Sequence, residues 1–455
     1  MIAVRVLIFH GYLLRGTGSN VYNAQLAQAL AGMGHEVDLF CQDRRADELD
    51  WVGGNIRVHV PDIGGLLPVF VADRYEGFEV KTFPELSEAE LDRYIEANVT
   101  AVREVAALAG GIDLALANHL VMGPAILARA EVAPFAVKIH GSALEYTVKP
   151  HPRFLPYARE GVEAAGGVLT GSGHTAESLW AALPDVPGLR EKTRLGPPGV
   201  DVEEFRPRGE REPLVAFVGK LIVSKGVDLL LAAWPLVRAA HPGVRLELAG
   251  YGAYEEALRR LAGALDRGDL EQAREIARRG WALEGGEERP LPILSAFLAD
   301  PPAGYAEMAR AAAGSVEFVG RLEHHEVADF FPRAEAMVMP STFPEAFGMV
   351  AVEAAACGTL PVSAGHSGML EVSRQLRDAL PDPAAGLVSF PVEEGAVEAI
   401  AARLDGWLGL PENQRESARE ALVGTVRRLW SWEGVARGVL VAAAGELGDL
   451  PRPGN

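Results

Sequence analysis

The sequence predicts an α/β protein with two domains, each built on a parallel sheet. Three observations lead to this fold class. The chain has 455 residues, more than one hydrophobic core usually supports. Short apolar runs alternate with segments of helical spacing in both halves, which is typical of βαβ units. The proline-rich stretch 194–207 interrupts this alternation and leads into the charged residues 208–212, so we predict a domain boundary near residue 205.

In the first half, a strand over 4–9, a helix over 19–33 and a strand over 36–40 make a parallel βαβ unit. We expect Ser19 or Asn20 to cap this helix. Residues 60–81 have the composition of a loop, and a loop above the carboxyl edge of a sheet often carries binding contacts. The other predicted elements are helix 84–109, strand 113–117, helix 123–129, strand 135–139, helix 157–164, strand 167–169 and helix 172–182, which begins with a capping sequence.

The second half repeats this order. Its predicted elements are strand 214–218, helix 227–240, strand 245–249, helices from 255, strand 316–319, helix 325–333, strand 336–339, strand 360–363 and further helices to the end of the chain. Residues 266–312 look like an inserted, mostly helical segment of alternating charge. Because ligands bind at the carboxyl ends of the strands in such sheets, we expect two sheets that face each other across a ligand cleft.

The composition argues against several classes of protein. A formal net charge of −19 disfavours nucleic acid, whose phosphates attract basic surfaces, and also disfavours docking on an anionic membrane. No apolar stretch approaches the roughly 18 residues of a membrane span. Residues 1–9 are too short for a signal peptide, so we expect a cytoplasmic protein. Cys41 and Cys357 fall in separate apolar segments and are expected to be buried, reduced thiols.

A partial dinucleotide-binding fingerprint lies near the start of the chain. Gly16 and Gly18 are followed about 20 residues later by Asp38. We reject this interpretation because Val21 stands where the third glycine belongs. The loop that begins at His10 is also too long, and Asp38 lies inside its strand rather than at the strand's end.

The stretch 341–353 places two carboxylates around a predicted helix start. Glu345 precedes an apolar run and Glu353 follows eight positions later. If the chain is helical from Phe347, the two carboxylates lie about 12 Å apart along the axis. The paired carboxylates of a glycoside hydrolase lie closer, at about 5 to 9.5 Å, so this spacing argues against hydrolysis. The free N–H groups at a helix start suit a bound phosphate.

Charged and titratable residues follow several predicted strands. Lys220 and Lys225 flank the loop before helix 227–240, where cations would stabilise negative charge on a departing phosphate group. His140 follows strand 135–139 and precedes a Gly-Ser turn, and His10 and His119 also end strands. Since the chain is acidic overall, an anionic substrate needs such locally placed cations.

Five motifs, taken in order, resemble those of the retaining family 4 of GT-B glycosyltransferases. They are G-T-G-S at 16–19, H-G-S at 140–142, P-G-V-D at 198–201, F-V-G-K-L-I-V-S-K-G at 217–226 and E-A-F-G-M-V-A-V-E at 345–353, which is similar to the family's E-x7-E motif. The resemblance implies the GT-B architecture, with two Rossmann-like domains facing each other across a cleft. It also implies transfer of a hexosyl unit from a nucleotide-diphosphate sugar to a hydroxyl acceptor, with retention of configuration. The family usually has arginine where this chain has Lys220.

The resemblance also implies roles for individual residues. The catalytic residues would be His140, Lys225 and Glu345. The donor would be bound by Gly16, Gly18, Lys220, Lys225, Arg321, Leu322, Glu345, Ala346, Phe347, Gly348, Met349 and Glu353. Within that set, Glu345 would hold the sugar, Glu353 the ribose and the backbone near Arg321 the base. The acceptor would contact His10, His119 and Tyr146, and the Ser367-Gly368 loop would lie at the same edge as the donor residues.

We therefore predict an acceptor-side domain over 1–205, a donor-side domain over 206–425 that contains the insertion 266–312, and a terminal segment over 426–455. This segment opens near Trp430 and resembles the family's last helix, which returns to the first domain. The sequence contains no Asp-x-Asp motif and no histidine–carboxylate cluster with metal spacing. We expect metal-independent transfer and no cofactor.

Two other functions fit the same architecture. The chain could be a nucleotide-sugar epimerase or a sugar phosphorylase, and release of nucleoside diphosphate only in the presence of acceptor would distinguish transfer from both. It could also be a non-catalytic subunit that binds a nucleotide sugar. The expected partners are a nucleotide sugar and a small-molecule or glycan acceptor, with no nucleic acid and no peripheral membrane contact. The base, the sugar, the acceptor, the linkage and the oligomeric state are left open.

Overall fold

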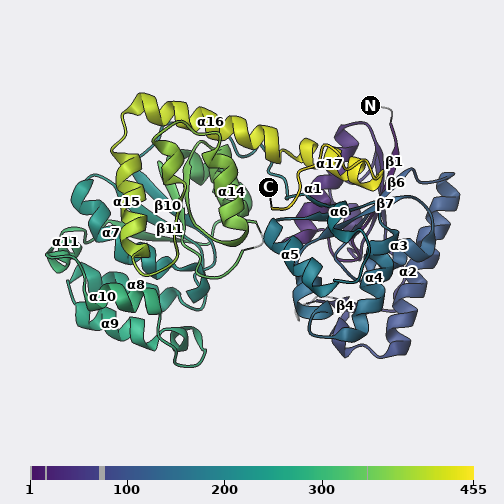
Figure 1. Cartoon of the computed structure of the whole chain (residues 1–455), viewed down its shortest axis with the longest axis horizontal. Helices are drawn as coiled ribbons and strands as arrows, with labels where there is room; N and C mark the ends of the chain where they lie inside the picture. Colours follow the sequence, from purple (N-terminus) through teal and green to yellow (C-terminus); the bar gives the residue numbers. More distant parts are fainter. Residues whose placement is uncertain (1–2, 16–17, 71–76, 346, 455) are drawn as a thin grey trace. The chain divides into compact units, whose positions relative to one another are not determined.

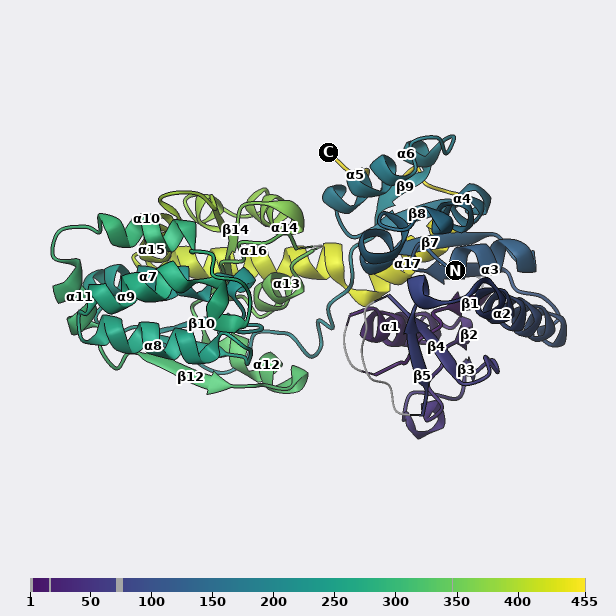
Figure 2. The ribbon, with the colours of Figure 1, turned by 90° about the horizontal axis from the view of Figure 1, so that it is seen from below.

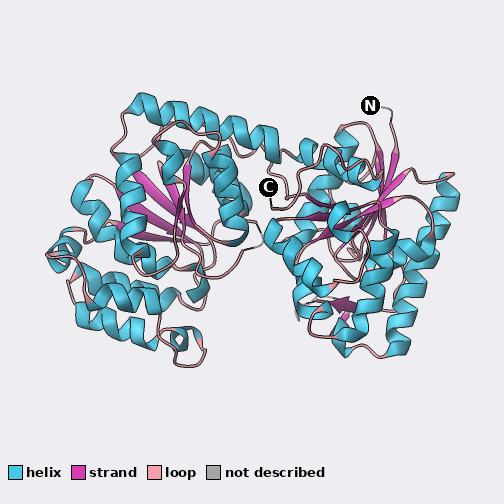
Figure 3. Cartoon of the chain, in the orientation of Figure 1, coloured by secondary structure: helices cyan, strands magenta, loops and turns pink. Residues whose placement is uncertain are grey.

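The protein, seen in a computed structural model that describes residues 3–15, 18–70, 77–345 and 347–454, divides into two compact units. Unit 1 comprises residues 1–199 and 432–455, and unit 2 comprises residues 200–431. In each unit, helices cover both faces of a central sheet (Figures 1 and 3). The predicted α/β class with parallel sheets is confirmed. The divisions fall six residues before the predicted 205 and six residues after the predicted 425.

Unit 1 is built on a parallel sheet of seven strands in the order β3-β2-β1-β6-β7-β8-β9. These strands are β1 (Arg5–Phe9), β2 (Glu36–Phe40), β3 (Ile56–His59), β6 (Leu114–Asn118), β7 (Phe135–Ile139), β8 (Gly167–Thr170) and β9 (Thr193–Leu195). The order reverses between β1 and β6. At such a switch point the connections after the two strands lead to opposite faces, which leaves a crevice at their carboxyl ends.

The helices of unit 1 cover both faces of this sheet. They are α1 (Ser19–Gly32), α2 (Glu88–Ala109), α3 (Gly123–Ala130), α4 (Leu155–Ala164), α5 (Gly173–Ala182), α6 (Leu189–Lys192) and α17 (Trp432–Ala443). Helix α17 comes from the end of the chain and packs against α1, β6, β7 and β8. Its residues Val435, Ala436 and Val439 are buried in the same apolar cluster as Leu26 and Leu116. The end of the chain therefore completes the core of unit 1.

Three local expectations turn out differently. Residues 60–81 are not all loop, because β4 (Leu66–Val69) and β5 (Glu79–Thr82) pair as a small parallel sheet with buried apolar side chains on β4. Neither Ser19 nor Asn20 caps α1; the amide of Asn20 instead donates to the carbonyl of Arg15. Trp430 ends a helix rather than opening the last one. The predicted cap of α5 is confirmed, since the hydroxyl of Ser172 accepts a hydrogen bond from the N–H of Thr175.

Unit 2 is built on a parallel sheet of six strands in the order β12-β11-β10-β13-β14-β15. These are β10 (Leu214–Val218), β11 (Arg245–Ala249), β12 (Val316–Gly320), β13 (Ala336–Met339), β14 (Leu360–Ala364) and β15 (Ser389–Phe390). The order reverses between β10 and β13. The loops after these two strands, 219–226 and 340–348, therefore meet at the switch point of this sheet. We call residues 219–226 the lysine loop.

The helices of unit 2 are α7 (Val227–Ala240), α8 (Glu255–Asp266), α9 (Leu270–Arg279), α10 (Pro292–Ala299), α11 (Tyr305–Ala311), α12 (His324–Phe330), α13 (Met349–Ala356), α14 (Ser367–Arg377), α15 (Ala396–Leu408) and α16 (Glu412–Trp430). A single large apolar cluster, which includes Trp234, Trp407 and Trp430, runs through the unit. None of the helices in the described part of the chain has both the length and the apolar character that a membrane span requires.

Candidate functional site

A chain of buried polar side chains crosses the switch point of unit 1. His10 follows β1, Asn118 ends β6 and His140 follows β7, while Asn23 comes from α1. His140 Nε2 lies 2.8 Å from Asn118 Oδ1, Asn118 Nδ2 donates to Asn23 Oδ1 at 2.7 Å, and Asn23 Nδ2 lies 3.1 Å from His10 Nδ1. The two asparagines are fully buried. Four side chains from four elements thus form one hydrogen-bonded chain, which we call the histidine chain.

Backbone carbonyls fix the direction of every bond in the histidine chain, because a carbonyl oxygen only accepts. Asn118 Nδ2 also donates to Phe9 O, and Asn23 Nδ2 also donates to Ser19 O. Asn118 Oδ1 therefore faces His140, whose Nε2 must carry the hydrogen. Asn23 in turn donates to Nδ1 of His10.

The imidazoles of this region are neutral. Burial lowers the pKa of His10 to about 4 and holds the pKa values of His119 and His140 well below the ordinary 6.5. His119 lies 4.9 Å from His140 between ring centres, and neither of its ring nitrogens has a hydrogen-bond partner. Nδ1 of His140 has no partner among the described residues either. A neutral His140 with its hydrogen on Nε2 presents an unprotonated Nδ1 that can accept a hydrogen bond from a hydroxyl.

A second cluster occupies the switch point of unit 2. The ammonium group of Lys225 contacts the carboxylate of Glu345 in an ion pair. The hydroxyl of Ser341 donates to the same carboxylate oxygen at 3.0 Å. Both charged side chains are about one-quarter exposed. A lysine and a carboxylate that lie 120 residues apart in sequence are thus brought together by the loops after β10 and β13.

The start of α14 holds the backbone of Glu345 in place. The N–H of Glu345 donates to the hydroxyl of Ser367 at 2.9 Å, and the N–H of Gly368 donates to the carbonyl of Glu345 at 3.0 Å. His366 Nε2 donates to the carbonyl of Ser341 at 2.8 Å, since that oxygen only accepts. The carboxylate of Glu345 is therefore presented from a backbone fixed at both its N–H and its carbonyl group.

The predicted helix start at Phe347 is wrong, because helix α13 begins at Met349, after Gly348. Only residues 349–353 of the path between the two carboxylates are therefore helical, and the separation of about 12 Å stays a prediction. The two groups instead have separate partners: Glu345 pairs with Lys225, whereas the buried Glu353 accepts a hydrogen bond from His324 at 3.2 Å. That bond raises the pKa of His324.

The other predicted donor residues of unit 2 have contacts of their own or are exposed. Phe347 is buried and packs edge-on against Trp430, with 6.0 Å between ring centres. Arg321 pairs with Glu323 at 3.1 Å, and Leu322 is half-buried. Lys220 is exposed, with no ion-pair or hydrogen-bond partner among the residues that the structure describes.

Of the remaining predicted residues, those that the structure describes do not join either cluster. Gly16 and Ala346 lie outside the described residues, and Gly18 directly precedes α1. Tyr146 is 61% exposed on a short helical turn, Leu144–Val148, and contributes nothing to the histidine chain. Asp38, considered for a dinucleotide, is buried and bonded to His59 at 2.8 Å, which explains it as a structural ion pair. Cys41 and Cys357 are free and buried, and burial raises both pKa values to about 12, as expected of inert thiols.

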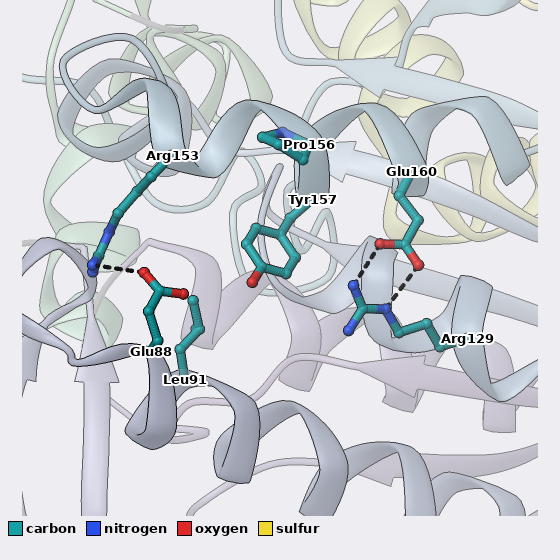
Figure 4. A pocket seen from close by; sticks show the side chains of 7 residues that line it. All are labelled: Glu88, Leu91, Arg129, Arg153, Pro156, Tyr157 and Glu160. Carbon is teal, nitrogen blue, oxygen red and sulfur yellow. Dashed lines mark hydrogen bonds and ion pairs between the residues drawn. The ribbon is translucent and has the colours of Figure 1, made fainter.

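A pocket of about 320 Å³ lies elsewhere on unit 1, between α2, α3 and α4 (Figure 4). Ion pairs frame it at both ends: Arg153 pairs with Glu88, and Arg129 makes a two-bond pair with Glu160. None of the predicted site residues lines this pocket. Its two arginines are engaged by protein groups, so it offers no free charge to a phosphate. Across the described residues, no group of three or more histidine, cysteine, aspartate or glutamate side chains is placed to hold a metal ion.

Comparison with known families agrees with this geometry. The family described as "Glycosyltransferase Family 4" matches residues 16–204, and the family described as "Glycosyl transferases group 1" matches residues 201–269 and 307–422. The two matches correspond to most of unit 1 and most of unit 2. The chain belongs to glycosyltransferase family 4. Residues 270–306 of this family 4 chain lie outside both family matches.

Individual relatives agree with the assignment to family 4. A D-inositol 3-phosphate glycosyltransferase of Segniliparus rotundus is 32% identical over 55% of this chain, but the match spans only 46% of that relative's length. A second one, from Frankia alni, is 27% identical over 93% of both chains. The solved structure of Anabaena Alr3699/HepE in complex with UDP and glucose matches 97% of this chain with a TM-score of 0.59 at 14% identity, which establishes the GT-B fold.

The structure adds residues that the sequence did not reveal for this family 4 chain. Asn23, Asn118 and His324 each hold a predicted site residue through a hydrogen bond. His366 instead bonds to Ser341 and Ser367, which both bond to Glu345. The sequence could have indicated a role for Asn118, because Asn118 and His119 are two polar residues at the end of an apolar strand. Nothing in the sequence indicated such a role for Asn23 and His324, since a polar residue on a helix is ordinarily solvated.

Proposed function

We propose that the chain transfers a hexosyl unit from a nucleotide-diphosphate sugar to a hydroxyl acceptor, with retention of configuration and without a metal ion. The observation that carries this proposal is the pairing of Lys225 with Glu345 at the switch point of unit 2. A cation next to a carboxylate suits a donor that is anionic at its diphosphate and rich in hydroxyls at its sugar. Membership of family 4 supports the same conclusion.

In this proposal Lys225 stabilises the charge that develops on the departing nucleoside diphosphate. Its ammonium group is a compact charge with three hydrogen atoms, so it can contact phosphate oxygens while it still contacts Glu345. The N-terminus of α13, behind Gly348, adds free N–H groups and a partial positive charge. Lys220 and Lys225 are also the last lysines of the sequence, because residues 226–455 contain arginine but no lysine.

The carboxylates of unit 2 act on hydroxyls in this proposal. Glu345 accepts hydrogen bonds from the transferred sugar, and Glu353 accepts them from the ribose, where His324 holds it in position. Base recognition would use the backbone near Arg321 and Leu322. No metal is needed if Lys225 and the helix N-terminus supply the positive charge, although this independence is itself part of the proposal.

His140 supplies a hydrogen-bond acceptor rather than a charge. Its low pKa keeps the ring neutral, and the histidine chain keeps the hydrogen on Nε2. We therefore assign its Nδ1 to a hydroxyl of the sugar or of the acceptor, and not to the diphosphate. His10 and His119 support the same edge of unit 1 and are assigned to the acceptor side.

The test is a calorimetric screen of the purified protein against UDP, GDP and ADP sugars, followed by a transfer assay. We expect one nucleotide class to bind, and we expect release of nucleoside diphosphate only when an acceptor is present, at the same rate with and without a chelator. The product's anomeric configuration, measured by NMR, should match that of the donor. Interconversion of sugars without release would favour an epimerase, formation of a sugar phosphate a phosphorylase, and tight binding without turnover on a broad acceptor panel a non-catalytic subunit.

A further inference from the structure

The segment 270–306 is an addition to the fold that the family shares, because it lies between the two matched stretches 201–269 and 307–422. It is nevertheless a fixed part of unit 2. Helix α9 packs against α8 and α10, and α10 packs against α7 and α15 (Figure 2). Its side chains Ile276, Leu294 and Leu298 are buried in the core of the unit.

Between α9 and α10 the chain makes a short turn, Trp281–Glu284, that is held by its own surroundings. The N–H of Trp281 donates to the carbonyl of Arg289 at 3.1 Å, and the guanidinium of Arg289 lies 4.4 Å from the centre of the Trp281 ring. A Cβ at Gly280 would overlap that same carbonyl oxygen, so only glycine allows the backbone to approach Arg289 this closely at the start of the turn. Glu284, at the end of the turn, therefore starts from a defined backbone position.

From this turn Glu284 reaches the lysine loop. Its Oε2 accepts a hydrogen bond of 2.7 Å from the backbone N–H of Val223. Val223 begins the short helical turn that ends at Lys225, and the first N–H groups of such a turn have no partner within it. A charged acceptor makes this bond stronger than a neutral one would.

The opposite side of the lysine loop is fixed by the loop after β13. The N–H of Thr342 donates to the carbonyl of Ser224 at 2.9 Å, and Glu345 contacts the ammonium group of Lys225. The residues from Val223 to Lys225 are thus held between Glu284 from the added segment and residues 342–345 from the shared fold. Removing either side would leave the backbone of Lys225 held from one side only.

We propose that Glu284 is a positioning residue for Lys225, and that the added segment 270–306 thereby sets how tightly the diphosphate of the donor is bound. The identity of the ligand rests on the proposed function, whereas the positioning of the loop does not. Loss of the carboxylate leaves the N–H of Val223 without its partner and lets the loop move. Lys225 then has to be ordered again each time a donor binds.

Three variants separate the contribution of side-chain length from that of charge: Glu284→Ala, Glu284→Asp and Glu284→Gln. Glu287→Ala, an exposed glutamate three residues along, is the matched control. We expect Glu284→Ala to weaken binding of nucleoside diphosphate about tenfold and Glu284→Gln, which keeps the acceptor oxygen, by about threefold or less. Glu284→Asp is one methylene shorter and should resemble Ala more than Gln. The donor KM should rise in the same order while the acceptor KM stays constant.

Hydrogen exchange of the peptide that covers residues 221–226 provides a readout without ligand. We expect faster exchange in Glu284→Ala and Glu284→Asp than in the wild type and in Glu287→Ala. Equal exchange in all four proteins would overturn the proposal, and so would unchanged nucleotide affinity in Glu284→Ala and Glu284→Asp. If the wild type binds none of UDP, GDP and ADP, the proposed function fails, and the exchange comparison still decides whether Glu284 positions the loop.

Discussion

Single side chains in this protein derive their chemistry from partners that come from other elements. Burial keeps His140 neutral, and Asn118 fixes its tautomer by accepting a hydrogen bond from Nε2. Asn118 is itself oriented because the carbonyl of Phe9 accepts from its amide. Lys225 and Glu345 meet because two loops converge at one switch point. The function of a residue here depends on its neighbours as much as on its own type.

Changing Asn118 to aspartate should shift the pH profile of the reaction. A carboxylate next to Nε2 favours the charged imidazolium, so the pKa of His140 should rise from its low value. Since Nδ1 must be unprotonated to accept a hydroxyl, kcat/KM of Asn118→Asp should fall on the acid side at a higher pH than in the wild type. Rates measured between about pH 5 and 8 test this expectation.

Asn98→Asp is the control for the Asn118 variant. Asn98 is also buried, but among the described residues its amide donates only to the carbonyl of Tyr94 on its own helix. A pH profile that shifts equally in both variants, or in neither, would contradict the assignment of His140.

Lys138 should give unit 1 a stability that depends on pH. Burial lowers its pKa from 10.5 to about 7, so the folded protein holds fewer protons than the unfolded chain between these values. The free energy of unfolding should therefore rise with pH across that interval, by up to about 1.4 kcal/mol per pH unit. Lys138→Met should remove this slope and Lys149→Met, at an exposed lysine, should keep it. Urea titrations at several pH values would show a retained slope in Lys138→Met if the explanation were wrong.

At the scale of elements, the alternation of apolar runs and helical segments predicted the βαβ order, because parallel strands buried on both faces need such runs. It failed at β4, where Leu66–Val69 lies within a stretch rich in glycine and proline, and pairing with β5 rather than local sequence makes the strand. The helix start at Met349 was misplaced for a similar reason. Phe347 packs against Trp430, a contact distant in sequence, and Gly348 then allows the turn into α13.

The lysine loop requires glycine at position 226. Gly226 has a φ of 65°, and a Cβ there would overlap the carbonyl oxygen of Pro340. Gly209 has nearly the same φ, 66°, but open space around it. Gly209→Ala should cost about 1 kcal/mol of stability through backbone strain alone. Gly226→Ala should displace Lys225 and weaken nucleotide binding about tenfold or more, as measured by calorimetry. Equal nucleotide affinities for the two variants would contradict this role of the loop.

At the scale of the whole molecule, the sequence predicted two domains with boundaries at 205 and 425, and the two compact units divide after residues 199 and 431. The proline-rich stretch that suggested 205 continues past the division, since Val200 already bonds to Trp430 within unit 2. Likewise, α16 extends to Trp430 and α17 begins at Trp432. Boundaries depend on which core a residue joins, and composition alone does not reveal this.

Removing residues 432–455 should unfold unit 1 and spare unit 2. Helix α17 buries Val435, Ala436, Val439 and Leu440 against the sheet of unit 1, and burying each larger side chain contributes about 1.5 to 3 kcal/mol. The sum is comparable to the whole stability of a domain. Calorimetry of the truncated chain should show one unfolding transition, with apolar surface already exposed to a dye. Two unchanged transitions would contradict the claim that the chain end completes unit 1.

The most direct test of the central claim is the acceptor-dependent release of nucleoside diphosphate by Lys225→Met. If Lys225 stabilises the departing diphosphate next to Glu345, this variant should retain the fold but lose about a hundredfold or more in kcat, the size expected for one electrostatic stabiliser of the transition state. Lys149→Met, on unit 1, should react at the rate of the wild type. Full transfer activity in Lys225→Met would contradict the assignment of the active site.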